Sequence, residues 1–298
     1  MSVYDPDDLR PLCSREAFSG RLVPLQTTGR ACDGLHSATR SEAVFAIAEM
    51  LAVCAGITVL FWVLNPRMLQ PGMAPVVLLF SLVLGLYVIW LSPHVIHGDS
   101  LEERGLGGLK TLFIRTDNFW STTAVILPVT AVLACALVLA GVLRNPTALA
   151  SVNWRRFLIK HGLYLVWATI QALFFFGYFM QRLRTVVLAL PQVSARRAGS
   201  VRGSVVFLTA ILFGLAHTPN PVMMLLTFLI GGLWAWYFWE HRNIIVIAAS
   251  HAFLGTIIHQ ILMLNMRVGP AYWEPQRFYA NRVLFPFISQ WMGAPQFH

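Results

Sequence analysis

A few ionisable side chains lie inside otherwise apolar stretches of this sequence, and these are the residues whose types could do chemistry. They are Glu49, His161, His217, His251 and His259. An ionisable group is costly inside a bilayer, so it usually faces a cavity or a partner. A carboxylate beside an imidazole can activate a water molecule for hydrolysis, whereas three imidazoles are enough to bind zinc. Either chemistry requires these residues to be brought together from separate segments.

The five candidates differ in their settings. His161 lies beside Lys160 at the start of an apolar segment, which favours an interfacial position. His259 follows His251 by two helical turns, or about 80° of rotation, so the two share roughly one helical face. For His259, a polar group facing the helical bundle is the simpler interpretation. His217 ends the stretch FGLAH and His251 lies in SHAFLG, on neighbouring short apolar segments, and these two are the stronger site candidates.

The composition places these residues in a membrane protein. Of the 298 residues, 57% are hydrophobic and 12% are charged, and the mean hydropathy is +0.64, whereas a soluble domain has about 25% charged residues. Because a bilayer core about 30 Å thick needs roughly 20 apolar residues per helix, we predict an all-α, polytopic bundle of about seven transmembrane helices. The predicted segments are residues 43–64, 74–91, 119–143, 158–180, 203–217, 221–239 and 243–263.

The charged residues suggest how the chain is arranged across the membrane. We expect a polar cytosolic tail over residues 1–42, the bundle over residues 43–263 and a polar, aromatic tail over residues 264–298. A cytosolic amino terminus places 14 of the 22 Lys and Arg residues on the cytosolic side, and this bias favours that orientation. Anionic lipid headgroups account for the formal net charge of +9, so no nucleic-acid partner is needed to explain it.

Three short motifs follow one another within residues 158–263. The stretch QALFFFGYFMQRLR begins at Gln171, the pattern FxxxH matches Phe213 and His217, and a third motif falls on His251 and Gly255. In their order and membrane setting they resemble the EExxxR, FxxxH and HxxxN motifs of the CPBP family, the CAAX-protease and bacteriocin-processing (Abi) group of glutamate-type intramembrane proteases. The resemblance implies a CPBP-type helical fold, which we expect in a bacterial cytoplasmic membrane.

The sequence departs from the family pattern at four site positions. In active relatives, the first Glu and the FxxxH histidine activate a water molecule, the second Glu and the Arg support the site, and the last His and Asn stabilise the oxyanion. By position, Gln171 replaces the first Glu and Ala172 replaces the second. Phe176 stands in place of the Arg, and Gly255 in place of the Asn. The resemblance therefore carries over only the two histidines of the catalytic set.

These replacements predict an impaired enzyme. Gln171 can orient a water molecule but cannot deprotonate it, because an amide has no protonation equilibrium near neutrality. Losing a general base costs roughly 10²–10⁴-fold in rate, and losing an oxyanion donor costs about 10²–10³-fold. We therefore expect a membrane subunit or scaffold without a cofactor, which binds a transmembrane helix, a lipid or a lipidated peptide in the bilayer.

Two alternatives stay open from the sequence. The first is an active intramembrane endopeptidase of the CAAX or bacteriocin-processing type, using His217, His251 and an unidentified carboxylate such as Glu49. A snorkelling interfacial side chain is the simpler account of Glu49. The second is a metal site formed by His217, His251 and His259, although the sequence has no HExxH or similar fixed-spacing pair.

Overall fold

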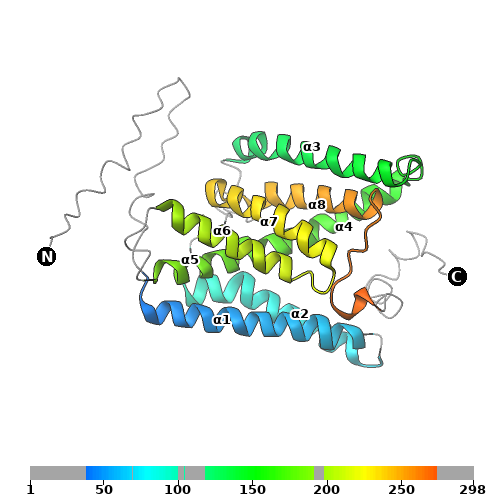
Figure 1. The fold of residues 1–298 in the computed structure, drawn as a ribbon. Coiled ribbons are helices and arrows are strands. Elements are labelled where there is room, and N and C mark those ends of the chain that lie inside the picture. Colours follow the sequence, from blue (N-terminus) through cyan, green and yellow to red (C-terminus); the bar gives the residue numbers. More distant parts are fainter. Residues whose placement is uncertain (1–37, 69, 100–103, 105–117, 191–197, 274–298) are drawn as a thin grey trace, which may run out of the picture.

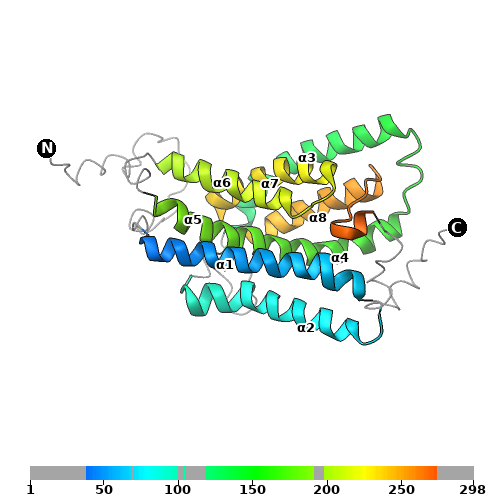
Figure 2. The ribbon, with the colours of Figure 1, turned by 60° about the horizontal axis from the view of Figure 1, so that its bottom comes forward.

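The computed structural model describes residues 38–68, 70–99, 104, 118–190 and 198–273 (Figure 1). These residues form helices and turns, and no strand occurs among them. The long helices lie side by side as a bundle (Figures 1 and 2), which confirms the predicted all-α architecture. The two predicted tails, residues 1–42 and 264–298, lie largely outside the described residues.

Each of the seven predicted apolar segments coincides with helical structure. The α-helices are α1 (Arg40–Thr58), α2 (Met73–Leu86), α3 (Phe119–Arg144), α4 (Trp154–Ala172), α5 (Met180–Leu188), α6 (Ala198–Leu215), α7 (Pro221–His241) and α8 (Ile244–Gln260). They are extended or joined by the π- or 3-10-helical segments η3 (Val59–Leu64), η4 (Asn65–Arg67), η5 (Tyr87–Ile96), η6 (Leu173–Phe179) and η7 (Gly269–Tyr272).

Five of the described helices are long and apolar enough to cross a membrane. They are Arg40–Arg67, Met73–Ile96, Phe119–Arg144, Trp154–Leu188 and Pro221–His241, whereas Gly199–Leu215 and Ile244–Gln260 are shorter apolar helices. The chain is therefore an integral membrane protein with a polytopic helical bundle.

Asparagine caps fix where three site-bearing helices begin. The side chains of Asn153, Asn220 and Asn243 accept hydrogen bonds from the backbone N–H groups three residues later, at the starts of α4, α7 and α8. Such caps satisfy N–H groups that have no partner within the helix. Pro221 follows Asn220 at the first helical position, where a missing N–H costs nothing.

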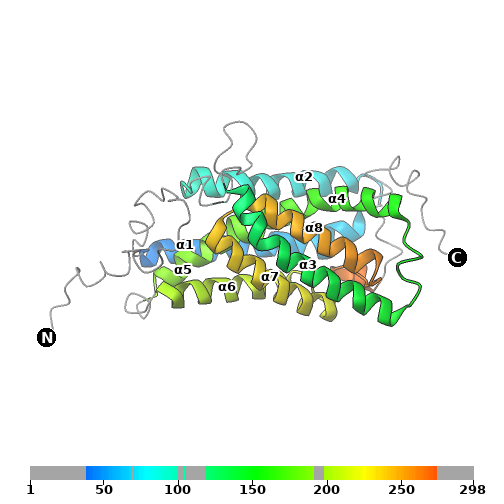
Figure 3. The same ribbon diagram turned by 90° about the horizontal axis from the view of Figure 1, so that it is seen from above.

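The short helix α8 lies against α3 and α4 (Figures 1 and 3). It is buried over most of its circumference, as expected of a helix that is apolar nearly all round. The hydroxyl of Ser250 on this helix lies 2.7 Å from that of Thr130 on α3 and accepts a hydrogen bond of 3.1 Å from Trp234 Nε1 on α7. This network joins three helices around His251, the next residue.

The fourth predicted segment continues beyond its expected end. The sequence suggested an end near Met180, because polar residues follow, but the helix runs on to Leu188. Arg182 in this extension is 1% exposed and donates a 2.5 Å hydrogen bond from Nη2 to Oδ2 of Asp99. The π-helical segment η6 interrupts the helix where the first family motif falls, and π-bulges are frequent at functional sites.

The bundle has two ends. At one end, α1 and α6 begin and α5 finishes (Figure 2). At the opposite end, α6 finishes and η7 packs beside the last turns of the first long helix. A backbone hydrogen bond of 2.8 Å from Gly269 N to Thr218 O joins η7 to the chain after α6.

Candidate functional site

The first two family motifs face each other in antiparallel helices. Phe175 in η6 packs against Phe213 in α6, with 4.6 Å between ring centroids. Gln171 lies one helical turn before Phe175, and His217 lies one turn after Phe213. Because the two helices run in opposite directions (Figure 2), this register places Gln171 and His217 at the same level of the bundle.

His217 is buried and bonded within its own motif. Its Nδ1 lies 2.8 Å from the carbonyl oxygen of Phe213, and its ring packs edge-on against the Phe213 ring at 5.3 Å. Since a carbonyl only accepts, Nδ1 carries the hydrogen and Nε2 is the acceptor nitrogen. This local bond fixes the tautomer and the orientation of the imidazole.

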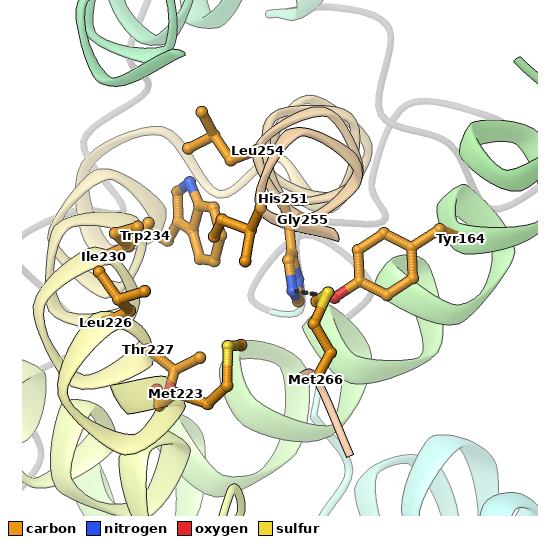
Figure 4. Close-up of a pocket in the computed structure, with 11 residues that line it drawn as sticks. Tyr164, Met223, Leu226, Thr227, Ile230, Trp234, His251, Leu254, Gly255 and Met266 are labelled. Carbon is orange, nitrogen blue, oxygen red and sulfur yellow. Dashed lines mark hydrogen bonds between the residues drawn. The ribbon is translucent and has the colours of Figure 1, made fainter. Parts of the chain in front are cut away.

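His251 lies in an aromatic cage. Its ring is 4.5 Å from that of Trp234 and 5.6 Å from those of Phe213 and Tyr164. Its Nε2 shares a 3.3 Å hydrogen bond with the Tyr164 hydroxyl (Figure 4), whereas its Nδ1 is buried without a hydrogen-bond partner. Phe213 thus contacts both His217 and His251, so the structure brings the two histidines to one aromatic ring.

Tyr164 occupies the space that a side chain at position 255 would need. A Cβ atom built on Gly255 would lie 2.1 Å from Cε1 and 2.8 Å from Cζ of Tyr164, which is far inside van der Waals contact. An asparagine at this position, as in the family motif, would therefore require the tyrosine ring to move. The Tyr164 hydroxyl, rather than an amide at position 255, is the polar neighbour of His251 (Figure 4).

The other three replaced positions lie in the packed interior of the bundle. Phe176 is fully buried and packs against Phe213 and Phe238, with ring centroids 6.1 and 5.8 Å apart. Ala172 is 1% exposed, and Gln171 Oε1 is buried without a hydrogen-bond partner. We call the set Tyr164, Gln171, Phe176, His217, His251 and Gly255 the neutralised site.

The cavity beside His251 is small. Its volume is about 20 Å³, which is room for about one water molecule. Besides Tyr164, His251 and Gly255, its walls include Thr227, Trp234 and Met266 (Figure 4). A peptide backbone does not fit into this space.

Glu49 belongs to a different polar cluster. Its Oε1 accepts a 2.9 Å hydrogen bond from the Tyr87 hydroxyl, and its Oε2 accepts one of 2.8 Å from His97 Nε2. Arg182 Nε lies 3.6 Å from the same Oε2. These partners come from η5 and α5, which finish at the end of the bundle where α1 begins, whereas His217 follows the opposite end of α6 (Figure 2).

The remaining histidines also have separate partners. Lys160 Nζ donates to His259 Nε2 at 3.0 Å, and His161 Nδ1 lies 3.3 Å from the Thr256 hydroxyl. Within the described part of the chain, no three His, Cys, Asp or Glu side chains are grouped so that they could hold a metal ion.

Sequence reasoning missed Tyr164 and the partners of Glu49. Tyr164 precedes Gln171 by seven residues, a spacing that puts both on one helical face, so a search along that face would have found it. His97 and Asp99 follow the second apolar segment in the stretch SPHVIHGD, where two histidines and an acid next to a span were a usable signal.

The fold and the site together define an all-helical membrane protein whose buried site is aromatic and lined by histidines. Residues 153–257 match the family model described as type II CAAX prenyl endopeptidase Rce1-like. A search of curated proteins and a search of solved structures each found no match. The matched span contains every residue of the neutralised site, and the match confirms the resemblance read from the motifs. Over residues 153–257 the chain is similar to the CAAX proteases of the CPBP family.

Proposed function

We propose that this protein is a catalytically impaired member of its family, a pseudoenzyme that acts as a membrane subunit or scaffold. The observation that carries the proposal is the Tyr164 ring, which fills the space beside Gly255 and bonds to His251. This arrangement removes the place of the asparagine that stabilises the oxyanion in active relatives. It also ties the remaining histidine of the third motif to a neutral phenol.

The missing general base supports the same conclusion. Hydrolysis in this family type requires a carboxylate to take a proton from water, and Gln171 cannot do so. Glu49 is a poor substitute, because both of its oxygens are bonded to other residues, Tyr87 and His97. The two histidines thus lack the carboxylate that works together with the FxxxH histidine in active relatives.

The closed site also bears on how a partner would be held. A cavity of about 20 Å³ cannot admit a lipid chain or a peptide. A transmembrane helix, a lipid or a lipidated peptide would therefore contact the outer faces of the bundle. In a bilayer such contacts rely on close packing and on interhelical hydrogen bonds.

The proposal is tested by looking for cleavage and for partners in one preparation. Protein purified in mild detergent is incubated with a prenylated CAAX peptide, and products are sought by mass spectrometry while copurifying membrane proteins are identified. We expect no product above that of heat-denatured protein, together with a partner that copurifies reproducibly. A cleavage product that disappears in His217→Ala would contradict the proposal.

A gain-of-function variant gives a second check. Gln171→Glu combined with Ala172→Glu and Phe176→Arg restores the charged residues of the first motif. We expect no efficient protease, because Tyr164 still fills the oxyanion position and a new buried ion set needs a matched environment. Strong cleavage by this variant would show that the first motif alone silences the protein.

A further inference from the structure

One end of the bundle gathers positive charge. At the end opposite the start of α1, α3 finishes, α4 begins and α8 finishes (Figures 2 and 3). Four cationic side chains lie there: Arg144 in the last turn of α3, Arg156 and Lys160 in the first two turns of α4, and Arg267 in the chain after α8. We call these four residues the basic cluster. Each of them is exposed or half-buried, so water and lipid headgroups can reach the cluster.

The contacts that the structure gives the basic cluster are with neutral groups. Lys160 Nζ donates to His259 Nε2 at 3.0 Å, and an imidazole nitrogen that accepts a hydrogen bond carries no proton. Arg144 Nη1 lies 3.4 Å from the carbonyl oxygen of Leu262. Arg156 Nε is buried without a hydrogen-bond partner. These contacts join α3 and α4 to the end of α8, but they do not neutralise the cations.

The cations are also close to one another. Arg156 and Lys160 are four residues apart in α4, so they share one helical face, and like charges at this spacing destabilise a helix. These two residues and Arg267 all lie close enough to His259 for their charges to act on it. The end of α8 is therefore surrounded by three positive charges.

No acidic side chain among the described residues offsets these charges. Glu42, Glu49, Asp99 and Glu240 are the acidic residues of the described chain. Glu42 and Glu49 lie in the first half of the first long helix, Asp99 is paired with Arg182, and Glu240 lies in the last turn of α7, where α8 begins. In the sequence after Glu240 the only acidic side chain is Glu274, which supplies one charge against four. The basic cluster therefore needs a further counter-anion.

The neighbouring side chains place the cluster at the membrane interface. Trp154, which begins α4, is 56% exposed, and Leu158, one turn further into the helix, is 66% exposed. Tryptophan is typical of the level of the lipid headgroups, whereas an exposed leucine in a membrane-spanning helix faces acyl chains. The basic cluster thus lies at the depth at which a bilayer has its phosphate groups.

We propose that the basic cluster binds the phosphate group of an anionic phospholipid, whose acyl chains lie along the exposed face of α4. Arginine binds two oxygens of one phosphate, and lysine acts on it as a point charge. Free phosphate in solution has the same chemistry, but only a lipid would also cover Leu158. This site is separate from the neutralised site and does not depend on the loss of proteolysis.

Native mass spectrometry of the full chain in detergent tests the proposal. Retention of phosphatidylglycerol is compared with that of phosphatidylcholine with the same acyl chains, in which a trimethylammonium group balances the phosphate. The site variants are Arg156→Gln, Arg267→Gln and the combination of the two. The matched control is Arg40→Gln, which removes an exposed arginine at the start of α1, at the opposite end of the bundle. Melting curves in lipid-free detergent show whether each variant is folded.

We expect the wild type to prefer phosphatidylglycerol. Each single site variant should weaken its binding by about fivefold and the combined variant by about 20-fold, as the loss of one and of two cations near an anionic headgroup predicts. Arg40→Gln should change it by less than about twofold. Phosphatidylglycerol should also raise the melting temperature of the wild type more than that of the combined variant, because a ligand stabilises the form that binds it.

Equal retention of the two lipids by the wild type would overturn the proposal. So would wild-type binding of phosphatidylglycerol by the folded combined variant, and if that variant does not fold, the two single variants decide by the same comparison. Displacement of the lipid by inorganic phosphate, itself bound by the wild type but not by the site variants, would keep the anion site but overturn the lipid as its ligand.

Discussion

Tyr164 and Gly255 act as a pair. The Tyr164 ring is accommodated because Gly255 has no Cβ atom. A Cβ atom there would lie 2.1 Å from Cε1 of the ring, so any other residue at position 255 would force the ring to shift. A side chain at position 255 and the Tyr164 ring therefore compete for one space. The pair also accounts for the position of the phenol hydroxyl, 3.3 Å from His251 Nε2.

The pairing predicts a non-additive effect on stability. Gly255→Ala should lower the free energy of unfolding by about 1–3 kcal/mol through overpacking, measured as a fall in melting temperature in detergent. In a Tyr164→Ala background the same change should cost little, because the clashing ring is gone. Gly162→Ala is the matched control, since a Cβ atom there meets nothing within 4 Å. Equal effects of Gly255→Ala and Gly162→Ala would contradict the pairing.

His217 is predicted to be dispensable. Without a carboxylate partner, its imidazole serves as a packing group whose Nδ1 donates to the carbonyl oxygen of Phe213, four residues earlier. His217→Ala should therefore leave the set of copurifying partners and the protein's cellular role largely intact, as scored by pull-down and complementation. Immunoblotting of membranes controls for abundance.

If His217→Ala abolished the cellular role while the protein stayed at normal abundance, the proposal that the protein is catalytically impaired would be in doubt. Glu49→Gln would then be tested in the same assays. An equal loss would identify Glu49 as a substitute base, in spite of its bonds to Tyr87 and His97. No loss would direct attention to a metal held by His217, His251 and His259, which elemental analysis would detect.

At the scale of elements, the register between η6 and α6 organises the neutralised site. The contact of Phe175 with Phe213 at 4.6 Å sets Gln171 level with His217. Cysteines at these two positions, in a background without the native cysteines, should be joined by a short bifunctional reagent in the folded protein. A pair at Gln171 and Leu208 should not be joined, because Leu208 lies about 13 Å further along the α6 axis. Crosslinking is read as a mobility shift, and failure with several short reagents would argue against the register.

The elements were more predictable than their contacts. Hydropathy located all seven helical segments, because apolar composition is set locally. The hydropathy pattern predicted too early an end for the fourth segment, because it treated Arg182 as a solvated residue. Arg182 is buried in the helix through its bond to Asp99, which lies 83 positions away in the sequence. Likewise, the motifs located His217 and His251, whereas the role of Tyr164 follows from its contact with α8, which no local pattern contains.

At the scale of the whole molecule, the alternating helix directions separate the two polar regions. The helices that carry Glu49 and Arg182, α1 and α5, begin and finish at one end of the bundle, and the chain after α8 lies at the opposite end (Figures 1 and 2). With the charge bias of the sequence, this arrangement leads us to propose that the first end is cytosolic.

The orientation can be tested with two single cysteines placed at opposite ends of the bundle. Leu190, just after α5, and Trp273, just after η7, are 49% and 60% exposed. With a cytosolic amino terminus, Leu190→Cys should be protected from a membrane-impermeant maleimide added to intact cells, whereas Trp273→Cys should be labelled. Permeabilised cells, in which both should react, provide the control for accessibility. The reverse pattern in intact cells would overturn the proposed orientation, and labelling of both positions would contradict a bundle whose two ends lie on opposite sides of the membrane.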